Sequence, residues 1–406
     1  MKMFLVISSC WVVLCACGAP EGGEVAEGGE DATVAVTVTS TMAPTSTPLP
    51  TATMAPTATP EPVTAGNAMY RGGVARTGVY DVEAVAKQGA LRWQFESGGE
   101  VHSSPVVVDG VVYVGSDDGF FYGLDGMTGE VVLQLEIKGK LFSSVTVVDG
   151  RAYFGSDFGL YGVDLATGEI AWHYRPEKGS ARVRSSPVYV DGVIYVGSDN
   201  GRVLAVTADD GSLLWETNIG IAMSSPAVAD GRLFLGNERD GLYALDLATG
   251  DLLWHFKTGK GMFASPAVVD DVVYFGTLAG NFYAVNVADG GEIWRVNIGK
   301  GVVSSAAVVN GRVYVGSLDQ HLYALEAETG EVVWRFKTEH EVYGSPSVAQ
   351  GVVYFGSDDT YVYAVDGETG ELVWKYGTGG FMGSSPAIGE GVVYFGSYDG
   401  SVYAVE

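Results

Sequence analysis

The sequence predicts an all-β protein, an eight-bladed β-propeller, and three observations lead to this expectation. A unit recurs eight times, with steps of 39 to 43 residues between equivalent positions. Each complete unit contains four short runs rich in β-branched and aromatic residues, separated by turns that contain glycine. The repeat shows none of the 3.6-residue periodicity of an amphipathic helix. A period of this length with four strands in each repeat is typical of a propeller blade.

Residues 344–374 illustrate the unit, with the sequence GSPSVAQGVVYFGSDDTYVYAVDGETGELVW. We expect its four strands at 347–349, 352–355, 361–365 and 371–376. The second strand carries no polar side chain, which is typical of a strand buried on both faces. The unit is therefore predicted to be a four-stranded antiparallel meander whose last strand faces solvent.

The fourth strand has a different pattern from the other three. Leu372, Trp374 and Tyr376 alternate with more polar neighbours, which predicts one apolar face for an outer strand. The tryptophan recurs in the other units, with Leu133 in the one missing place. The recurring residues are Trp93, Trp172, Trp215, Trp254, Trp294, Trp334 and Trp374.

The two ends of the array complement each other. Residues 91–95 form a fourth strand with no strands before it, and residues 401–405 form a third strand with no fourth after it. We therefore expect the strand at 91–95 to pair with the strand at 401–405 and complete an eighth blade, which removes the open sheet edges. Residues 67–90 lie outside the repeat and are predicted to be a lead-in segment that packs on the propeller of residues 91–406.

The N-terminal part has a composition unlike that of the repeats. Residues 1–16 are mostly apolar and too short to span a membrane, which is typical of a signal peptide. The end of this stretch resembles the lipobox of bacterial lipoproteins, which implies cleavage before Cys17 and lipid attachment there. The alternative is an ordinary signal peptide with incidental cysteines. Residues 17–66 are rich in Thr, Pro and Ala and are predicted to be a disordered tether, so we expect a lipid-anchored protein of the bacterial cell envelope.

Composition excludes several classes of site. The net charge is −26, which argues against nucleic-acid binding and against direct adsorption to anionic lipid, so the lipid anchor is the expected membrane contact. All three cysteines lie within residues 1–17, so the propeller can hold neither a disulfide nor a thiolate metal site. The five histidines have no ligand spacing, and we expect no metal. We also expect a monomer.

One motif carries a family resemblance. Residues 244–254 follow the pattern Ala-x-Asp-x-x-Thr-Gly-x-x-x-Trp, and residues 364–374 follow it again. This pattern resembles the tryptophan-docking motif of pyrroloquinoline-quinone (PQQ)-type propeller repeats. The resemblance implies that each indole packs between neighbouring blades, against the motif glycine. Residues 69–78 also resemble the lead-in that precedes such propellers.

The resemblance predicts the fold and leaves several functions open. The family includes PQQ-dependent dehydrogenases, the propeller lipoprotein of the outer-membrane β-barrel assembly machine, and scaffold domains. The dehydrogenase site needs a vicinal cysteine pair, calcium ligands and long insertions, whereas this domain lacks cysteine and has minimal loops. We therefore expect no cofactor and a non-catalytic scaffold that binds another envelope or surface protein, or a ligand. The alternatives are a PQQ-dependent oxidoreductase and a carbohydrate- or cell-wall-binding module that stacks sugars on Phe142, Phe158, Phe263, Tyr343 and Tyr398.

The eight copies differ from one another mainly in two connections, from the fourth to the first strand and from the second to the third. These connections emerge on one face of a propeller, around the channel mouth, and we expect the binding face there. The other interpretation is that its aspartates are ordinary turn residues. The candidate residues of the first connection are His102, Phe142, Arg184, Met223, Phe263, Val303, Tyr343 and Gly383. Those of the second connection are Asp117, Asp118, Asp157, Phe158, Asp199, Asn200, Glu238, Arg239, Asp319, Asp358, Asp359, Tyr398 and Asp399.

Overall fold

The computed structural model describes residues 68–406, apart from 83, 85–88 and 177–179. The predicted signal peptide, the lipidation site at Cys17 and the tether lie outside the described residues. Within the described part, no helix is long and apolar enough to cross a membrane. The described chain forms 32 strands and one short 3-10 helix, η1 (Tyr70–Gly72).

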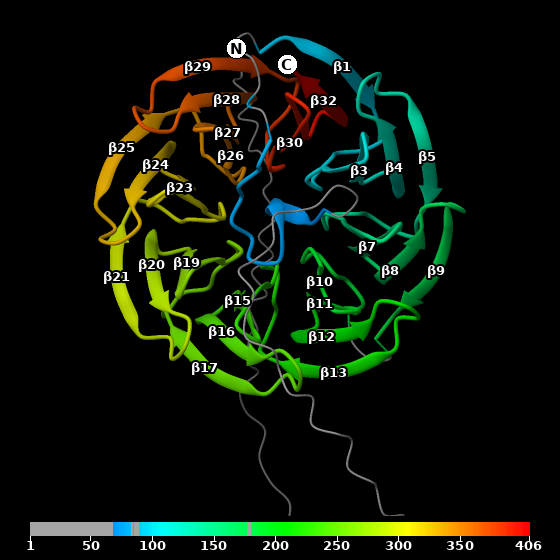
Figure 1. The fold of residues 1–406 in the computed structure, drawn as a ribbon, viewed down its shortest axis with the longest axis horizontal. Helices are drawn as coiled ribbons and strands as arrows, with labels where there is room; N and C mark the ends of the chain where they lie inside the picture. Colours follow the sequence, from blue (N-terminus) through cyan, green and yellow to red (C-terminus); the bar gives the residue numbers. More distant parts are fainter. Residues whose placement is uncertain (1–67, 83, 85–88, 177–179) are drawn as a thin grey trace, which may run out of the picture. The chain divides into compact units, whose positions relative to one another are not determined.

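The strands form eight four-stranded antiparallel sheets arranged as blades around a central channel (Figure 1). The first, innermost strands are β2 (Val106–Val108), β6 (Thr146–Val148), β10 (Val188–Val190), β14 (Ala227–Ala229), β18 (Ala267–Val269), β22 (Ala307–Val309), β26 (Ser347–Ala349) and β30 (Ala387–Gly389). The second strands are β3 (Val111–Gly115), β7 (Arg151–Ser156), β11 (Val193–Gly197), β15 (Arg232–Asn237), β19 (Val272–Gly276), β23 (Arg312–Ser317), β27 (Val352–Gly356) and β31 (Val392–Gly396). The third strands are β4 (Phe120–Asp125), β8 (Gly159–Asp164), β12 (Arg202–Thr207), β16 (Gly241–Asp246), β20 (Asn281–Asn286), β24 (His321–Glu326), β28 (Tyr361–Asp366) and β32 (Ser401–Val405). The fourth, outermost strands are β5 (Val131–Glu136), β9 (Glu169–Tyr174), β13 (Leu213–Asn218), β17 (Leu252–Lys257), β21 (Glu292–Asn297), β25 (Val332–Lys337), β29 (Leu372–Gly377) and β1 (Leu91–Glu96).

The ring closes as the sequence predicts. Strand β1 pairs antiparallel with β32, with Gln94 opposite Tyr403, so the eighth blade has the order β1-β32-β31-β30. Figure 1 shows the blue β1 beside the red β32. The pairing continues beyond the strand through two backbone hydrogen bonds between Ala90 and Glu406. The blade therefore contains both ends of the repeat array, which confirms the predicted eight-bladed fold.

Each fourth-strand indole lies against a glycine of a neighbouring blade. A Cβ placed on any of these glycines would lie 2.5–2.9 Å from an indole atom, so only glycine fits. The pairs are Trp93–Gly129, Trp172–Gly211, Trp215–Gly250, Trp254–Gly290, Trp294–Gly330, Trp334–Gly370 and Trp374–Gly89. Six of these indoles also donate a hydrogen bond of 2.8–3.2 Å from Nε1 to the carbonyl oxygen of the residue three positions before the glycine. Six of the seven contacts thus join two blades by packing and by a hydrogen bond, and the Trp374 contact joins them by packing.

The outer strand differs from its predicted alternation at one end. Leu372 is 48% exposed, whereas Trp374 is 5% exposed, so the prediction that both belong to one apolar face was wrong. A β-bulge causes the difference, because Trp374 lies opposite Ala364 while Leu372 lies opposite Val365. This register shift turns Leu372 to the other side of the sheet. All eight blades have an irregularity at the same place between the third and fourth strands.

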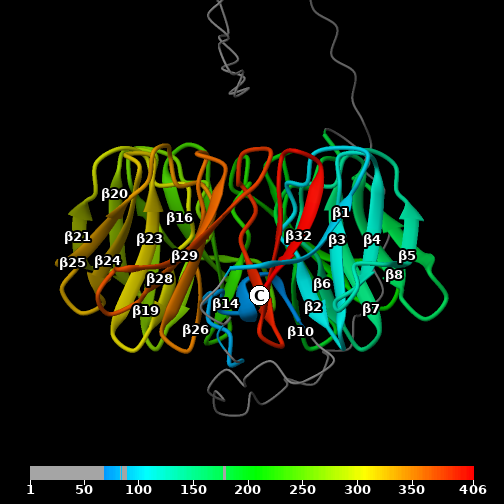
Figure 2. The same ribbon diagram turned by 90° about the horizontal axis from the view of Figure 1, so that it is seen from above.

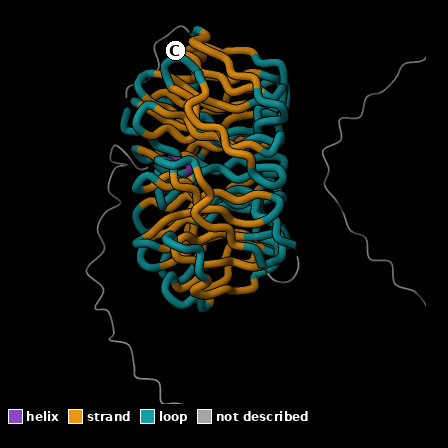
Figure 3. The backbone as a smooth tube through the Cα atoms, turned by 90° about the vertical axis from the view of Figure 1, so that its right-hand side faces the viewer, coloured by secondary structure: helices purple, strands orange, loops and turns teal. Residues whose placement is uncertain are grey.

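The lead-in segment crosses one end of the channel. Figure 2 shows it in blue near one face of the ring, and Figure 3 shows η1 at one face, with the loops collected at both faces. Its backbone forms hydrogen bonds with the first strands of five blades. The partners in those strands are Val147, Val228, Val268, Val308 and Val348. The segment therefore ties together strands that are far apart in the sequence.

Two arginines fix the lead-in. Arg71 and Arg76 are 1% and 0% exposed. Arg71 donates hydrogen bonds to backbone carbonyls that include those of Ala306 and Pro346. Arg76 donates to the carbonyl oxygens of Pro226, Ser186, Pro187 and Tyr70. Carbonyl groups at the inner ends of several blades thus depend on these guanidinium groups.

The docking contact predicts a difference between two glycine substitutions. Gly370→Ala should lower the free energy of unfolding by roughly 2–4 kcal/mol, because the new Cβ would meet Trp334 and φ is positive there. Gly351→Ala is the matched control: its φ is also positive, but nothing lies within 4 Å of the added Cβ, so we expect a loss of only about 1 kcal/mol. Urea denaturation measures both losses. Equal losses would show that the indole contact contributes nothing.

The buried arginines give a second prediction. Arg76→Met should lower the free energy of unfolding by about 3 kcal/mol, because it leaves buried carbonyl groups without donors. Arg295→Met is the control, since that side chain is 66% exposed and should change stability by less than about 0.5 kcal/mol. Thermal and urea unfolding report the difference. A loss for Arg76→Met no larger than that of the control would contradict the anchoring role.

Candidate binding face and channel pocket

The channel contains a pocket of about 230 Å³. The eight candidate residues of the fourth-to-first connections, one from each blade, all line it, and Tyr398 joins them. The remaining lining residues are Tyr70 and one serine from each blade. The structure therefore brings the whole first set of candidates together, whereas it places only Tyr398 of the second set in the pocket.

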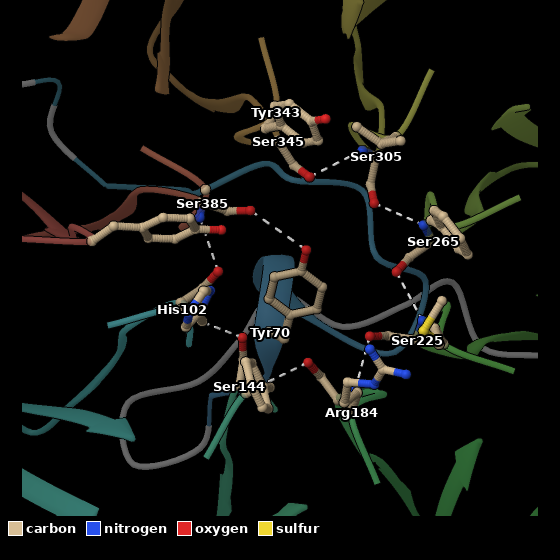
Figure 4. Close-up of a pocket in the computed structure, with 18 residues that line it drawn as sticks. Tyr70, His102, Ser144, Arg184, Ser225, Ser265, Ser305, Tyr343, Ser345 and Ser385 are labelled. Atoms are coloured by element: carbon tan, nitrogen blue, oxygen red, sulfur yellow. Dashed lines mark hydrogen bonds between the residues drawn. The ribbon is translucent and has the colours of Figure 1, made fainter. Parts of the chain in front are cut away.

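The eight serines form a closed layer, which we call the serine ring. Its members are Ser104, Ser144, Ser186, Ser225, Ser265, Ser305, Ser345 and Ser385. In seven of the eight steps the backbone N–H of one serine donates to the Oγ of the serine in the next blade, at 2.8–3.0 Å. Figure 4 shows this chain of contacts around the channel. These serines recur in every copy of the unit, which is a signal visible in the sequence, but no role was predicted for them.

Tyr70 closes the pocket from the lead-in side. Figure 4 shows its ring inside the serine ring, with the hydroxyl group directed toward Ser385. The two hydroxyl oxygens are 3.4 Å apart. The guanidinium carbon of Arg76 lies 5.3 Å from the centroid of the Tyr70 ring. Sequence reasoning expected the lead-in to pack on the propeller but missed Tyr70, because nothing in the lead-in itself indicates which blades it crosses.

Four of the candidate aspartates stabilise their own turns. In each, one carboxylate oxygen accepts a hydrogen bond from a tyrosine hydroxyl four residues later, at 2.5–2.8 Å. The pairs are Asp118–Tyr122, Asp319–Tyr323, Asp359–Tyr363 and Asp399–Tyr403. Burial, together with the neighbouring carboxylate, raises the pKa of Tyr323 to about 12. These contacts favour the structural interpretation for this group of aspartates.

Three other candidate aspartates form ion pairs with cations beside the channel mouth. The carboxylates of Asp117, Asp157 and Asp199 lie 2.6–2.7 Å from side-chain nitrogens of basic residues. Those residues are Lys140, Arg182 and Arg184, respectively. Burial raises the pKa of Asp117, but the hydrogen bonds from His102 and Lys140 together outweigh it and keep the pKa below the ordinary value. The pairs therefore offset the negative charge of these three candidate aspartates.

Asp358 has a different environment from these three. Its backbone N–H donates to the backbone carbonyl oxygen of Glu341, and the side-chain carboxyl groups of the two residues repel each other. Burial and this neighbouring charge raise the pKa of Asp358 to about 7. Glu238 and Arg239 belong to the same kind of second-to-third connection. Arg239 Nε lies 4.0 Å from Glu238 Oε1, and the Arg239 side chain is 79% exposed.

One cluster has the composition of a metal site. Within the described residues, Glu100, His102 and Asp117 are the one group whose ligand atoms come within 4.8 Å of one another. Asp117, however, already contacts the Lys140 ammonium group at 2.6 Å. The cluster therefore has a cation supplied by the chain itself.

The candidate aromatic residues divide into two groups. Phe142, Phe263, Tyr343 and Tyr398 line the pocket, and the His102 ring lies 4.9 Å from Phe142 and 4.2 Å from Tyr398. Phe158 lies apart from them: the Lys138 ammonium group is 4.8 Å from its ring centroid. Four of the five predicted stacking residues thus share one concavity.

The raised pKa of Asp358 predicts a pH-dependent effect on stability. The folded chain holds this proton more tightly than the unfolded chain, so ionisation of Asp358 destabilises the fold progressively from about pH 4 to about pH 7. Asp358→Asn should therefore raise the free energy of unfolding at pH 8 by on the order of 2 kcal/mol, allowing for solvent screening, and leave it unchanged at pH 3.5.

Asp366→Asn is the control with the opposite sign. Hydrogen bonds from the backbone and hydroxyl of Thr369 lower the pKa of Asp366. Its replacement should therefore destabilise the protein at neutral pH, with a smaller effect as the pH falls. Urea unfolding at several pH values measures both variants. A pH-independent effect of Asp358→Asn would show that this carboxyl is not perturbed.

Comparison with known proteins identifies the same family by a family model and by individual relatives. The sequence matches the family described as outer membrane protein assembly factor BamB over residues 78–225, 220–296 and 279–406. A protein of that name from Yersinia pestis is 28% identical over 177 residues, which is 38% of this chain and 45% of the relative. One from Moranella endobia (strain PCIT) is 28% identical over 158 residues, 35% of this chain and 40% of the relative. The alignments thus span less than half the length of these curated relatives.

Solved structures share the fold at low sequence identity. BamB from Moraxella catarrhalis superposes with a TM-score of 0.67 at 17% identity, covering 78% of this chain and 99% of that one. A quinohemoprotein alcohol dehydrogenase from Comamonas testosteroni gives a TM-score of 0.73 at 15% identity, covering 83% and 80%. The fold is therefore common to a protein named as an assembly factor and to one named as a dehydrogenase.

Proposed function

Because the chain belongs to the family of outer membrane protein assembly factor BamB, we propose that it is a non-catalytic scaffold of the bacterial envelope, anchored through a lipid on Cys17. Its channel-mouth face, formed by the fourth-to-first and second-to-third connections, binds another envelope protein. One observation carries this proposal. The positions that build the blades repeat in all eight copies, whereas the eight pocket-lining positions of the first connection hold seven different residue types.

The chemistry of the pocket supports binding over redox catalysis. Its lining contains no Asp, Glu, Asn or Cys among the described residues, so it offers none of the carboxylate, amide or thiol groups that the resemblance associates with a quinone dehydrogenase. Its side chains are instead hydroxyl, aromatic and aliphatic groups, with one arginine and one histidine. Such a mixture of aromatic and polar groups is typical of protein-binding surfaces.

The surrounding charges support a protein partner. Ion pairs such as Arg184–Asp199 and Lys140–Asp117 present both signs of charge beside the pocket, and Arg239 is largely exposed. A partner with complementary charges would gain orientation from them, more than affinity. The family relatives are named for the assembly of outer membrane proteins, and we propose a partner from that process here.

Site-specific photo-crosslinking in intact cells tests the binding face. A photoreactive residue at Tyr343 or Arg239 should give a discrete crosslinked protein, because both lie on the channel-mouth face. The matched controls are Val333 and Leu214, which are 40% and 53% exposed on outer strands. We expect no specific product from the controls. Crosslinks from the outer strands alone would overturn the proposed face.

A carbohydrate-binding function is a second candidate, and one observation favours it. Phe142, Phe263, Tyr343 and Tyr398 share one concavity, as a set of sugar-stacking residues would. In the same experiment, a glycan product in place of a protein product at Tyr343 would favour this alternative.

A further inference from the structure

Two buried positive charges, Arg71 and Arg76, lie behind the pocket lining, where Arg76 donates to the carbonyl oxygen of the lining residue Ser186, and no carboxylate of the described residues offsets them. Arg71 and Arg76 are almost completely buried and donate hydrogen bonds to backbone carbonyls, and Arg71 also interacts with the Tyr70 side chain. Neither forms an ion pair within the described part of the chain. A guanidinium group keeps its charge at neutral pH, and a charge in a poorly solvated interior acts strongly on its surroundings. The end of the channel beneath Tyr70 therefore attracts negative charge.

Hydroxyl groups supply donors directly above these charges. In the serine ring, the Oγ atoms accept backbone N–H groups from the neighbouring blade, for example Ser225 from Ser186 and Ser265 from Ser225. An Oγ that accepts in this way still has its own hydrogen to donate. Tyr70 adds a further hydroxyl group in the middle of the ring (Figure 4). The lower part of the pocket thus presents many O–H donors around one small volume.

The lining has no negative charge, although the chain carries a net charge of −26. Two acids beside the lining are paired with cations, Asp199 with Arg184 and Asp117 with Lys140, whereas Glu100 contacts the lining residue His102 at 2.9 Å. Burial also raises the pKa of Asp358 to about 7. An anion entering the channel therefore meets donors and positive charge in an otherwise acidic protein.

The eight lining residues that lie two positions before the serines are mixed in character, since His102, Arg184 and Tyr343 are polar and Gly383 has no side chain. The other four are apolar, and we call them the apolar collar: Phe142, Met223, Phe263 and Val303. A ligand that fits both levels has an anionic group of a few atoms at one end and an apolar body at the other. A volume of about 230 Å³ accommodates a short molecule or the end of a chain.

We propose that the channel pocket binds a carboxylate that carries an apolar body, held by the hydroxyl groups of Tyr70 and the serine ring above Arg71 and Arg76. The carboxylate belongs either to a free short-chain acid or to the C-terminus of a peptide. The inference deepens the proposed function, because it names the chemical group that the channel-mouth face takes into its centre. It can fail on its own, since a partner could contact the face without entering the pocket.

Calorimetric titration of the full-length protein in non-ionic detergent tests the proposal with four probes. Hexanoate and hexanamide have the same apolar body and differ in charge. An N-acetylated tripeptide ending in valine and its C-terminal amide repeat the comparison for a peptide source. We expect at least one acid to bind about tenfold or more tightly than its amide, because hydrogen bonds to a charged group are stronger than those to a neutral one. Binding of hexanoate points to a free acid, and binding of the tripeptide acid alone points to a peptide terminus.

Two variants test the site itself. Tyr70→Phe removes one hydroxyl group whose described partner is Ser385 at 3.4 Å, and should weaken binding of the acid about tenfold with little effect on folding. Val303→Asp places a negative charge in the apolar collar and should abolish binding. Leu318→Asp is the matched control: it adds the same charge outside the pocket, at the position where other blades carry Asp117 or Asp358, and should retain binding.

Three results would overturn the inference. They are equal affinity for acid and amide, no binding of any probe, and unchanged affinity of the Val303→Asp variant. Crosslinking from Tyr343 or Arg239 to a partner protein would still stand in each case, which separates failure of this inference from failure of the proposed function.

Discussion

The contact between an indole and a glycine of the neighbouring blade is the interaction on which the rest of the structure depends. The Trp334 ring leaves no room for a Cβ at Gly370, and its Nε1 donates to the carbonyl oxygen of Gly367. Repeated around the ring, this contact fixes the spacing between blades. That spacing brings the serines of neighbouring blades within hydrogen-bond distance in seven of the eight steps, so the geometry of the pocket follows from contacts on the outer side of the blades.

Closure extends the same contact across the chain ends. Trp374 docks on Gly89, two residues before β1, so the last complete repeat uses a glycine from the N-terminal side of the array. The terminal strands β1 and β32 then complete a blade that has the same strand order as the others. The lead-in adds a second tie at the inner end, where Arg71 and Arg76 bond to carbonyl groups of several blades. Ring closure and channel floor therefore both depend on residues that precede the first strand.

Much of the fold could be predicted from the sequence, because the same pattern of strand and turn residues occurs eight times. The number of blades, the strand positions and the closure follow from periodicity, turn residues and the incomplete ends. The outward turn of Leu372 did not follow, because a β-bulge changes which face a residue occupies without changing the alternation of residue types. The position of Tyr70 did not follow either, because it depends on how a non-repeating segment crosses blades that are distant in the sequence.

In the candidate site, too, some features could be predicted from the sequence and others depend on packing. The recurrence of the fourth-to-first connections predicted one set of residues around the channel, and all eight of them line the pocket together with the serine ring. The aspartates of the second connection look alike in sequence but have separate roles. Asp359 accepts from the Tyr363 hydroxyl, whereas Asp199 pairs with Arg184. The four-residue spacing of Asp359 and Tyr363 recurs in other blades and could have identified the structural group, while the cationic partners could be assigned only from the packed structure.

Native-state hydrogen exchange of the third strands tests most directly the claim that the blades form one closed ring. Strand β32 (Ser401–Val405) lies between β31 and β1, just as β28 (Tyr361–Asp366) lies between β27 and β29. The account predicts that the backbone amides of β32 exchange as slowly as those of β28, because both strands are internal and their opening requires loss of the ring. Exchange of β32 at the rate of the solvent-facing fourth strands would show that the C-terminal strand is a free edge and would contradict closure.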